Sequence, residues 1–270
     1  MVVKSKKAED HMGDLTETFE VLRQYRMKLN PAKCSFGVAS GKFLGYMVTE
    51  RGIEASPEQI KAIQGLRPPR SIKEVQRLTG KLAALNRFIS KSSDRCKLFY
   101  DLLRKNKSFQ WTDNHEKAFQ GIKDYFSNPL LLAKPQVGES LVLYLAVSES
   151  AVSAVLVREE GVEQLPVYYV SKTLLDAETR YSPLEKLVLA LVMASNKLRP
   201  YFEAHTIVVR TNLPMTNVMS RPEFTGRMAK WTIHLSGFDI RYEPRTAIKS
   251  QALADFVADF SPTLEEAATE

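Results

Sequence analysis

The sequence predicts an α+β fold in which a small helical module precedes a mixed five-stranded sheet with helices. In residues 57–128, apolar residues recur at helical spacing behind helix-capping motifs. In residues 140–171, three runs of strand-forming residues are separated by turn residues, which predicts antiparallel neighbours. A long helical run and further strands follow, so we expect the sheet to be mixed.

The segment before the helical module is expected to fold as helix, strand, strand. Residues 6–25 are amphipathic at helical spacing, and Asn30-Pro31 ends that helix. Two short strands are predicted at 34–38 and 42–48, and a turn at 50–52 follows them.

Capping motifs begin the first two helices of the module. Ser56 is a natural N-cap, Pro57 sits at the first helical position, and Gln59 completes a capping box. Ser71 and Glu74 form a second capping box before the next helix. One stripe of that helix is apolar: Val75, Leu78, Leu82 and Leu85.

Two more helical segments complete the module. Residues 99–105 form a short run, and residues 111–115 introduce a helix whose apolar positions continue to Phe126. Asn128-Pro129 and Lys134-Pro135 then mark the boundary to the sheet.

The sheet is predicted from its strand and turn residues. Strands are expected at 140–146, 152–158 and 165–171, with residues 148–151 as the first turn. The later elements are a helix at 177–199 closed by Pro200, a strand at 206–210, a short helix near Pro214, a helix at 225–235, a strand at 239–242 and a helix at 248–259. The tail from Thr263 is acidic and is expected to fray.

Composition excludes several classes of protein. The 270 residues can hold two compact domains, and 44% hydrophobic with 26% charged residues is ordinary for a soluble globular protein. No apolar run approaches the roughly 20 residues of a membrane span, and the first residues lack the apolar core of a signal peptide. Cys34 and Cys96 are too few for a disulfide framework, and the four histidines lack zinc-ligand spacing.

Positive charge is concentrated in the helical module. The net charge is +7, and residues 61–110 alone hold 13 basic and 3 acidic residues, whereas residues 137–270 hold 13 basic and 17 acidic. Such a field attracts a polyanion, and the interleaved arginines and aromatic residues favour nucleic acid. A solvated helical surface is the alternative explanation.

The hairpin at residues 143–156, Leu-Tyr-Leu-Ala-Val-Ser-Glu-Ser-Ala-Val-Ser-Ala-Val-Leu, resembles the opening hairpin of the RNase H-like domain in reverse transcriptases of gypsy-type LTR retrotransposons. Met1-Val-Val-Lys-Ser5 resembles the strand that follows the Tyr-X-Asp-Asp polymerase motif of that family. Residues 28–36 resemble the end of the palm, and Phe43-Leu-Gly-Tyr46 resembles the primer grip. Arg245 stands where the family usually has glycine.

This resemblance covers nearly the whole chain and implies four regions. They are the palm end with a primer-grip-like hairpin at 1–56, a helical thumb at 57–133, a degenerate RNase H-like domain at 134–262 and a flexible tail at 263–270. The family's polymerase aspartates would lie just upstream of Met1, so we expect no polymerase activity from these residues alone.

The resemblance also implies nucleic-acid contacts in two of these regions. In the hairpin and the thumb they fall on Phe43, Leu44, Gly45, Tyr46, Lys73, Arg77, Lys81 and Arg87. Gly45 permits close backbone approach, and Tyr46 offers a flat apolar surface. The first three basic residues share one helical face, a geometry suited to phosphates, although they can equally serve to solubilise the helix.

RNase H chemistry needs carboxylates that hold two magnesium ions about 3.5–4 Å apart. The four carboxylate positions of the family fall, in chain order, on Ala146, Glu185, Asn212 and Asp255. Glu185 and Asp255 are therefore the retained catalytic and metal-binding candidates, and the other two positions are neutral. We expect magnesium, the family's cofactor, to bind weakly or not at all.

Two other acids lie close enough in sequence to be substitutes. Asp259 is one helical turn after Asp255, and Glu149 is three residues after Ala146. An exposed surface acid is the preferred interpretation of both, because an odd offset along a strand reverses the side-chain direction of Glu149. Without catalysis, Glu185 is expected to stabilise its helix through the helix dipole.

Three functions remain open. The favoured one is a fragment of a retrotransposon Pol polyprotein that binds template–primer, as RNA–DNA or DNA duplex, with an inactive RNase H-like domain. Its expected partners are that duplex and the rest of the Pol polyprotein, with no membrane, in a cytoplasmic particle or the nucleus. The alternatives are an active magnesium-dependent RNase H with an altered metal site and a non-enzymatic protein-interaction scaffold.

Overall fold

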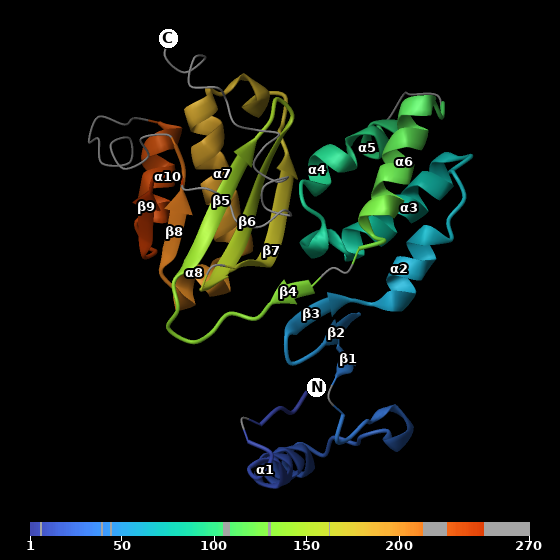
Figure 1. The fold of residues 1–270 in the computed structure, drawn as a ribbon, viewed down its shortest axis with the longest axis vertical. Coiled ribbons are helices and arrows are strands. Elements are labelled where there is room, and N and C mark those ends of the chain that lie inside the picture. The colour runs from blue at the N-terminus through green and yellow to red at the C-terminus, as the bar shows by residue number, and fades with distance from the viewer. Residues whose placement is uncertain are drawn as a thin grey trace.

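The computed structural model contains two β-sheets and a helical module, which the chain forms between β3 and β4 (Figure 1). It describes residues 1–245 except 6, 39, 44, 105–108, 129–130, 162 and 213–225. Three predicted segments lie outside the described residues: the helix near Pro214, the helix at 248–259 and the tail from Thr263. No helix among the residues described is both long and apolar enough to cross a bilayer.

The first sheet has four antiparallel strands in the order β1-β2-β3-β4. They are β1 (Gly41–Phe43), β2 (Tyr46–Val48), β3 (Gly52–Ala55) and β4 (Leu131–Ala133). β4 comes from the far end of the helical module, so this sheet joins the chain before the module to the chain after it. Gly52 has a φ of 150°, and a Cβ there would overlap the carbonyl oxygen of Leu132, so this close approach of β3 and β4 requires glycine.

Two predictions for the N-terminal segment are corrected. The predicted helix at 6–25 forms as α1 (His11–Gln24), which begins later than predicted, but residues 34–38 are not a strand. No strand in the described part of the chain pairs with them, and the Phe36 side chain is 61% exposed, so neither a ladder nor burial supports extension. The single strand predicted at 42–48 is a hairpin, because Gly45 adopts a φ of 84° between β1 and β2.

The described residues of the helical module form five α-helices, and the sequence predicts four of them. They are α2 (Pro57–Gln64), α3 (Ile72–Ala84), α4 (Ser92–Arg95), α5 (Lys97–Leu102) and α6 (Asp113–Tyr125). The short α4 is the one not predicted. The predicted apolar stripe of α3 is buried. The buried Ser56 side chain makes no capping hydrogen bond, so the first predicted capping box is wrong. The second forms in part: the Ser71 hydroxyl accepts the Glu74 N–H, but the Glu74 carboxylate accepts the N–H of Arg70 and not that of Ser71.

The second sheet has five strands in the order β7-β6-β5-β8-β9 and is mixed, as predicted. They are β5 (Leu141–Val147), β6 (Ala151–Glu160), β7 (Glu163–Thr173), β8 (Ile207–Arg210) and β9 (Ile240–Glu243). β5, β6 and β7 are antiparallel neighbours, whereas β8 runs parallel to both β5 and β9. The predicted hairpin between β5 and β6 is confirmed.

One face of the second sheet is covered by helix α7, which lies behind the sheet in Figure 1. The helices of this layer are α7 (Pro183–Lys197), α8 (Arg199–Ala204) and α10 (Arg227–Leu235). Leu143 of β5 and Val188 of α7 belong to its fully buried core. Pro200 does not close the long helix as predicted; it lies in the first turn of α8, where its missing N–H leaves no bond unmade.

The opposite face of the second sheet shares a core with the helical module. Val142, Tyr144 and Ala146 of β5 belong to the same buried cluster as Phe88 and Phe99 of the module. The single-turn helix η2 (Asn86–Phe88), α4 and β4 all lie against β7. The module and the second sheet are therefore packed together through apolar side chains, beside the β7 edge in Figure 1.

Candidate functional site

The C-terminal ends of β5, β8 and β9 meet at one edge of the second sheet. Because the three strands are parallel, their register places Tyr144 beside Arg210 and Arg210 beside Glu243. Two residues further along each chain segment come Ala146, Asn212 and Arg245. We call this place the strand-end edge. It brings together two of the predicted metal-ligand positions and an arginine for which no role was predicted.

Ala146 lies in β5 opposite Ser153 and is 4% exposed. Its methyl group is part of the core shared with the helical module. A methyl group has no lone pair for a metal, and this apolar environment would penalise a charged side chain. Glu149, a possible substitute ligand, is exposed in the turn after β5.

Asn212 follows β8 almost directly and is exposed. The preceding residue, Thr211, donates its N–H to the Glu243 carbonyl oxygen at 3.1 Å, which holds this backbone against β9. Asn212 offers an uncharged amide oxygen, a poorer ligand for magnesium than a carboxylate. The fourth predicted ligand, Asp255, and the alternative acid Asp259 lie outside the described residues.

Glu185 lies in the first turn of α7, and both of its carboxylate oxygens have partners. Oε2 accepts the Ser182 N–H at 3.0 Å and the Ser182 hydroxyl at 3.2 Å, which completes a capping box. Oε1 lies 3.5 Å from Arg227 Nε, and that guanidinium stacks 4.1 Å from the centroid of Tyr181. The carboxylate therefore caps a helix and pairs with an arginine. The capping box was not predicted, although the Ser-to-Glu spacing of three residues could have indicated it, whereas nothing in the sequence indicated Arg227.

A polar network lies two residues before the strand-end edge on each of the three strands. Arg210 donates two hydrogen bonds to Glu159, at 2.6 and 3.0 Å, and its Nε lies 3.3 Å from a Glu243 oxygen. The buried Tyr144 hydroxyl accepts from Gln164 at 2.9 Å and from Arg210 at 3.4 Å. The bonds to Glu159 raise the pKa of Arg210 above its ordinary value. Two carboxylates on this face are thus paired with a guanidinium.

The side chains at the strand-end edge do not fit a pair of magnesium ions. Two hard divalent cations need several charged oxygens in one place. The strand-end edge, as far as it is described, offers a methyl group, an amide and a guanidinium. Within residues 1–245 as described, no group of three His, Cys, Asp or Glu side chains is placed to hold a metal. Among the predicted metal-ligand positions that the structure describes, Glu185 is the one with a charge, and its oxygens already have partners.

The predicted basic face of α3 is open to solvent. Lys73 and Arg77 are exposed, Lys81 is partly exposed, and none of the three makes an ion pair with a described residue. Their spacing of four residues places them along one side of the helix. This side can therefore meet a phosphate backbone without first breaking an internal contact.

Arg87, the fourth predicted basic contact, has a different environment. Its guanidinium lies between the rings of Tyr46 and Tyr168, 4.6 and 4.7 Å from their centroids. The Tyr46 hydroxyl donates to the Ala84 carbonyl oxygen at 3.2 Å, and its ring lies 5.7 Å from that of Phe88. Arg87 thus connects the β1–β2 hairpin, the helical module and β7. Tyr46 has internal partners in place of the free apolar surface expected for it.

The rest of the primer-grip-like hairpin is only partly enclosed. Phe43 pairs with Tyr46 across the hairpin and is partly buried. Gly45 is exposed at the turn, where its positive φ brings the backbone to the surface. Leu44 lies outside the described residues.

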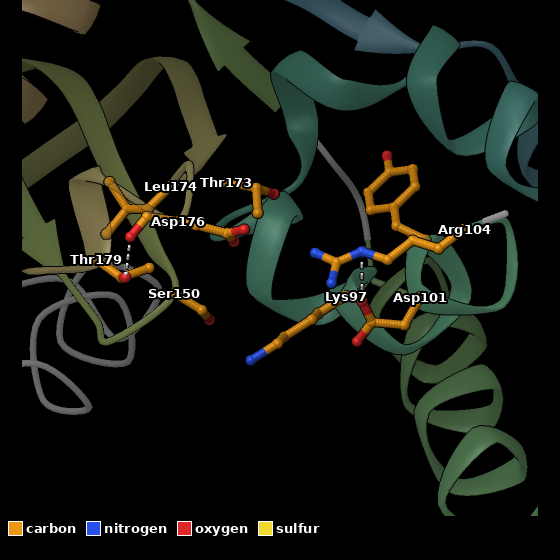
Figure 2. Close-up of a pocket in the computed structure, with 9 residues that line it drawn as sticks. Lys97, Asp101, Arg104, Ser150, Thr173, Leu174, Asp176 and Thr179 are labelled. Atoms are coloured by element: carbon orange, nitrogen blue, oxygen red, sulfur yellow. Dashed lines mark hydrogen bonds and ion pairs between the residues drawn. The ribbon is translucent and has the colours of Figure 1, made fainter. Parts of the chain in front are cut away.

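A cleft of about 200 Å³ separates α5 from the end of the second sheet (Figure 2). It is lined by Lys97, Tyr100, Asp101, Arg104, Ser150, Thr173, Leu174, Asp176 and Thr179. Two cations and two carboxylates line it, and Arg104 Nε lies 3.3 Å from Asp101 on the same side of the cleft. The cleft therefore has no net charge with which to attract a phosphate.

Beside this cleft, Asp94 of α4 connects the helical module to the β5–β6 turn. Its Oδ1 accepts hydrogen bonds from the hydroxyls of Ser148 at 3.0 Å and Ser150 at 3.5 Å. Burial raises the pKa of the Asp94 carboxyl above its ordinary value, although these hydrogen bonds, Lys91 and Lys97 oppose the shift.

Comparison with known proteins finds sequence similarity to the polyproteins of transposable elements. Residues 111–209 match the family described as an RNase H-like domain found in reverse transcriptase. The chain is 30% identical over 238 residues to the retrovirus-related Pol polyprotein from transposon 412 of Drosophila melanogaster, covering 87% of this chain and 19% of that protein. It is 27% identical over 272 residues to the transposon Tf2-3 polyprotein of Schizosaccharomyces pombe, covering 97% and 20%. The chain thus spans about a fifth of the length of these curated relatives.

Solved structures share its fold. The foamy viral protease–reverse transcriptase in complex with RNA/DNA hybrid superposes with a TM-score of 0.75 and 21% identity, covering 92% of this chain and 34% of that one. The foamy viral protease–reverse transcriptase dRH in complex with double-stranded DNA gives a TM-score of 0.74 and 20% identity, covering 92% and 45%.

Proposed function

We propose that the chain binds template–primer duplex without cutting it. Two similarities support this proposal: residues 111–209 match the RNase H-like domain found in reverse transcriptase, and the relatives of the chain are transposon polyproteins. The chain is then part of a gypsy-type Pol polyprotein with a palm end at 1–56, a thumb at 57–133, an RNase H-like domain at 134–262 and a tail at 263–270. Helices α2 to α6 fall within the second region, which supports this division.

The observation that carries the proposal is an intact five-stranded sheet with a buried methyl group at the first metal position. Ala146 is 4% exposed within continuous strand pairing, so the fold persists where the ligand is missing. The shared core gives this sheet another use, because it supports the helical module. Magnesium has no well-formed site in this proposal, and hydrolysis is absent.

The duplex is bound by the exposed basic face of α3. Lys73, Arg77 and Lys81 meet phosphates of either an RNA–DNA or a DNA duplex, since phosphate contacts carry no sequence information. The foamy viral neighbours were solved with these two classes of duplex, which supports the choice. The other partner is the rest of the Pol polyprotein, in a cytoplasmic particle or the nucleus, without membrane contact.

Duplex binding is tested by fluorescence anisotropy across a series of salt concentrations. Lys73→Gln/Arg77→Gln is expected to lower the slope of log affinity against log salt by about 2, one for each lost phosphate contact. The matched control is Lys117→Gln/Arg180→Gln, which removes two exposed charges elsewhere. An equal loss of slope in both variants contradicts a specific role for α3. Wild-type binding whose affinity does not depend on salt concentration favours the protein-interaction scaffold.

Loss of hydrolysis is tested by incubating the purified chain with an RNA–DNA hybrid and magnesium. The RNA strand is expected to remain intact. Cleavage that Glu185→Gln abolishes, and that the control Glu178→Gln leaves unchanged, would establish the active-nuclease alternative. Glu178 is a suitable control because it is another acid that is paired, with Lys172, and it is not one of the four predicted metal-ligand positions.

A further inference from the structure

We infer that the Arg245 guanidinium occupies the strand-end edge in place of metal charge and closes that edge to divalent cations. This inference rests on the proposed function, since it gives a second reason for the missing magnesium site. Neutral residues at Ala146 and Asn212 remove ligands, whereas a resident cation actively opposes a metal ion.

The position of Arg245 follows from the strand register. Glu243 of β9 lies beside Arg210 of β8, which lies beside Tyr144 of β5. Arg245 comes two residues after Glu243, at the same level as Asn212 and Ala146 on the neighbouring segments. The end of β9 therefore presents its arginine to the two positions where the resemblance places metal ligands.

The side chain reaches across the end of β8 to β5. Arg245 Nη2 donates to the carbonyl oxygen of Leu145 at 3.5 Å, and Leu145 immediately precedes Ala146. β5 and β9 flank β8, so they are separated by about 10 Å, and the arginine spans most of that distance. The paired part of β5 and β8 ends at Tyr144 and Arg210, so the guanidinium lies just past that end.

The environment keeps this charge effective. Arg245 is partly buried, and burial lowers its pKa from the ordinary value, but a guanidinium stays protonated in proteins. Reduced solvent screening strengthens its repulsion of a second cation.

The test compares Mn²⁺ binding, by isothermal titration calorimetry, in variants that differ at Arg245. Asn212→Asp restores one carboxylate at an exposed position, so this variant is expected to fold. Asn212→Asp/Arg245→Ala is expected to bind Mn²⁺ about tenfold more tightly than Asn212→Asp alone. The matched control, Asn212→Asp/Arg241→Ala, removes an exposed arginine from the same strand and is expected to bind like Asn212→Asp.

Charge and size are separated by two further variants. Asn212→Asp/Arg245→Gln is expected to bind tightly and Asn212→Asp/Arg245→Lys weakly, if charge is responsible. Equal affinity with and without Arg245, or an equal gain in the Arg241 control, overturns the inference. Hydrolysis of an RNA–DNA hybrid by the wild-type chain would instead overturn the proposed function, while the Mn²⁺ comparison would still report on Arg245.

Discussion

The second sheet has two charged regions that are built differently. At its junction with the helical module, Arg87 lies between two tyrosine rings, and the Asp94 carboxylate accepts hydrogen bonds from two serine hydroxyls. At the strand-end edge, a buried methyl, an exposed amide and a guanidinium stand together. The junction supplies partners for its charges, whereas the edge, as far as it is described, lacks the acids that magnesium needs. The difference indicates a sheet whose shape supports the helical module independently of any hydrolysis.

The largest expected effect is at the junction. Phe88→Ala removes a ring that is 1% exposed in the shared core, and it should lower the free energy of unfolding by about 3–5 kcal/mol. Urea denaturation measures the loss. Phe36→Ala, at a 61% exposed ring, is the control and should change it by less than about 0.5 kcal/mol. Similar values for the two variants would mean that the shared core does not hold the junction.

A smaller effect is expected from Arg87. Arg87→Ala removes two cation–π contacts and should cost about 1–2 kcal/mol of unfolding free energy. Arg77→Ala should leave stability nearly unchanged and should weaken duplex binding. If Arg87→Ala instead weakens duplex binding at unchanged stability, Arg87 belongs to the phosphate-binding face and the two regions have been assigned wrongly.

The raised pKa of Asp94 leads us to expect that the stability of the protein depends on pH. Its pKa is raised in the folded state, so its contribution to stability is present below the unfolded value of about 4 and is lost as pH rises through the folded value. Asp94→Asn keeps an oxygen for the two serines and removes the buried charge. Relative to wild type, it should therefore gain stability with rising pH, by less than about 1 kcal/mol. Urea midpoints from pH 3.5 to 7 measure this, and parallel pH profiles would rule it out.

The smallest effect is expected for Glu185. Glu185→Gln retains an oxygen for the helix cap and loses the partly exposed ion pair with Arg227, a change of about 0.5 kcal/mol or less. Thermal unfolding with and without millimolar magnesium should give the same midpoint in both proteins. A magnesium-dependent rise that is seen in wild type and disappears in the variant would show that the edge holds a metal after all.

Local patterns predicted most of the fold. The strands between residues 140 and 171 and the apolar stripe of α3 are visible because the period of their apolar residues is repeated over several turns or strand positions. β4 was missed because three residues between two proline-containing segments have no period, and their partner, β3, lies on the other side of the helical module. Residues 34–38 have strand-forming composition but no neighbouring strand, and composition cannot supply one.

The site was predictable only in part. The resemblance implied metal-ligand positions at Ala146, Glu185 and Asn212, which stay predictions, and the Ser182 cap has the spacing of a sequence motif. The tyrosines around Arg87 come from the first sheet and from β7. The local sequence therefore indicated only a basic residue close to the predicted phosphate-binding residues. Likewise, Arg245 reaches Leu145 on a strand formed far earlier in the chain. Both depend on tertiary contacts that no window of sequence contains.

The close approach of β3 and β4 at Gly52 has a mechanical consequence. The chain enters the helical module from β3 and leaves it into β4, and these two strands are hydrogen-bonded to each other. Both covalent connections of the module therefore lie at adjacent points. Force applied to α3 by a bound duplex would act on this pair of strands as a single pivot, and β4 would pass it to β7, against which it lies. A side chain at position 52 would spread the pair and loosen the pivot while leaving every phosphate contact in place.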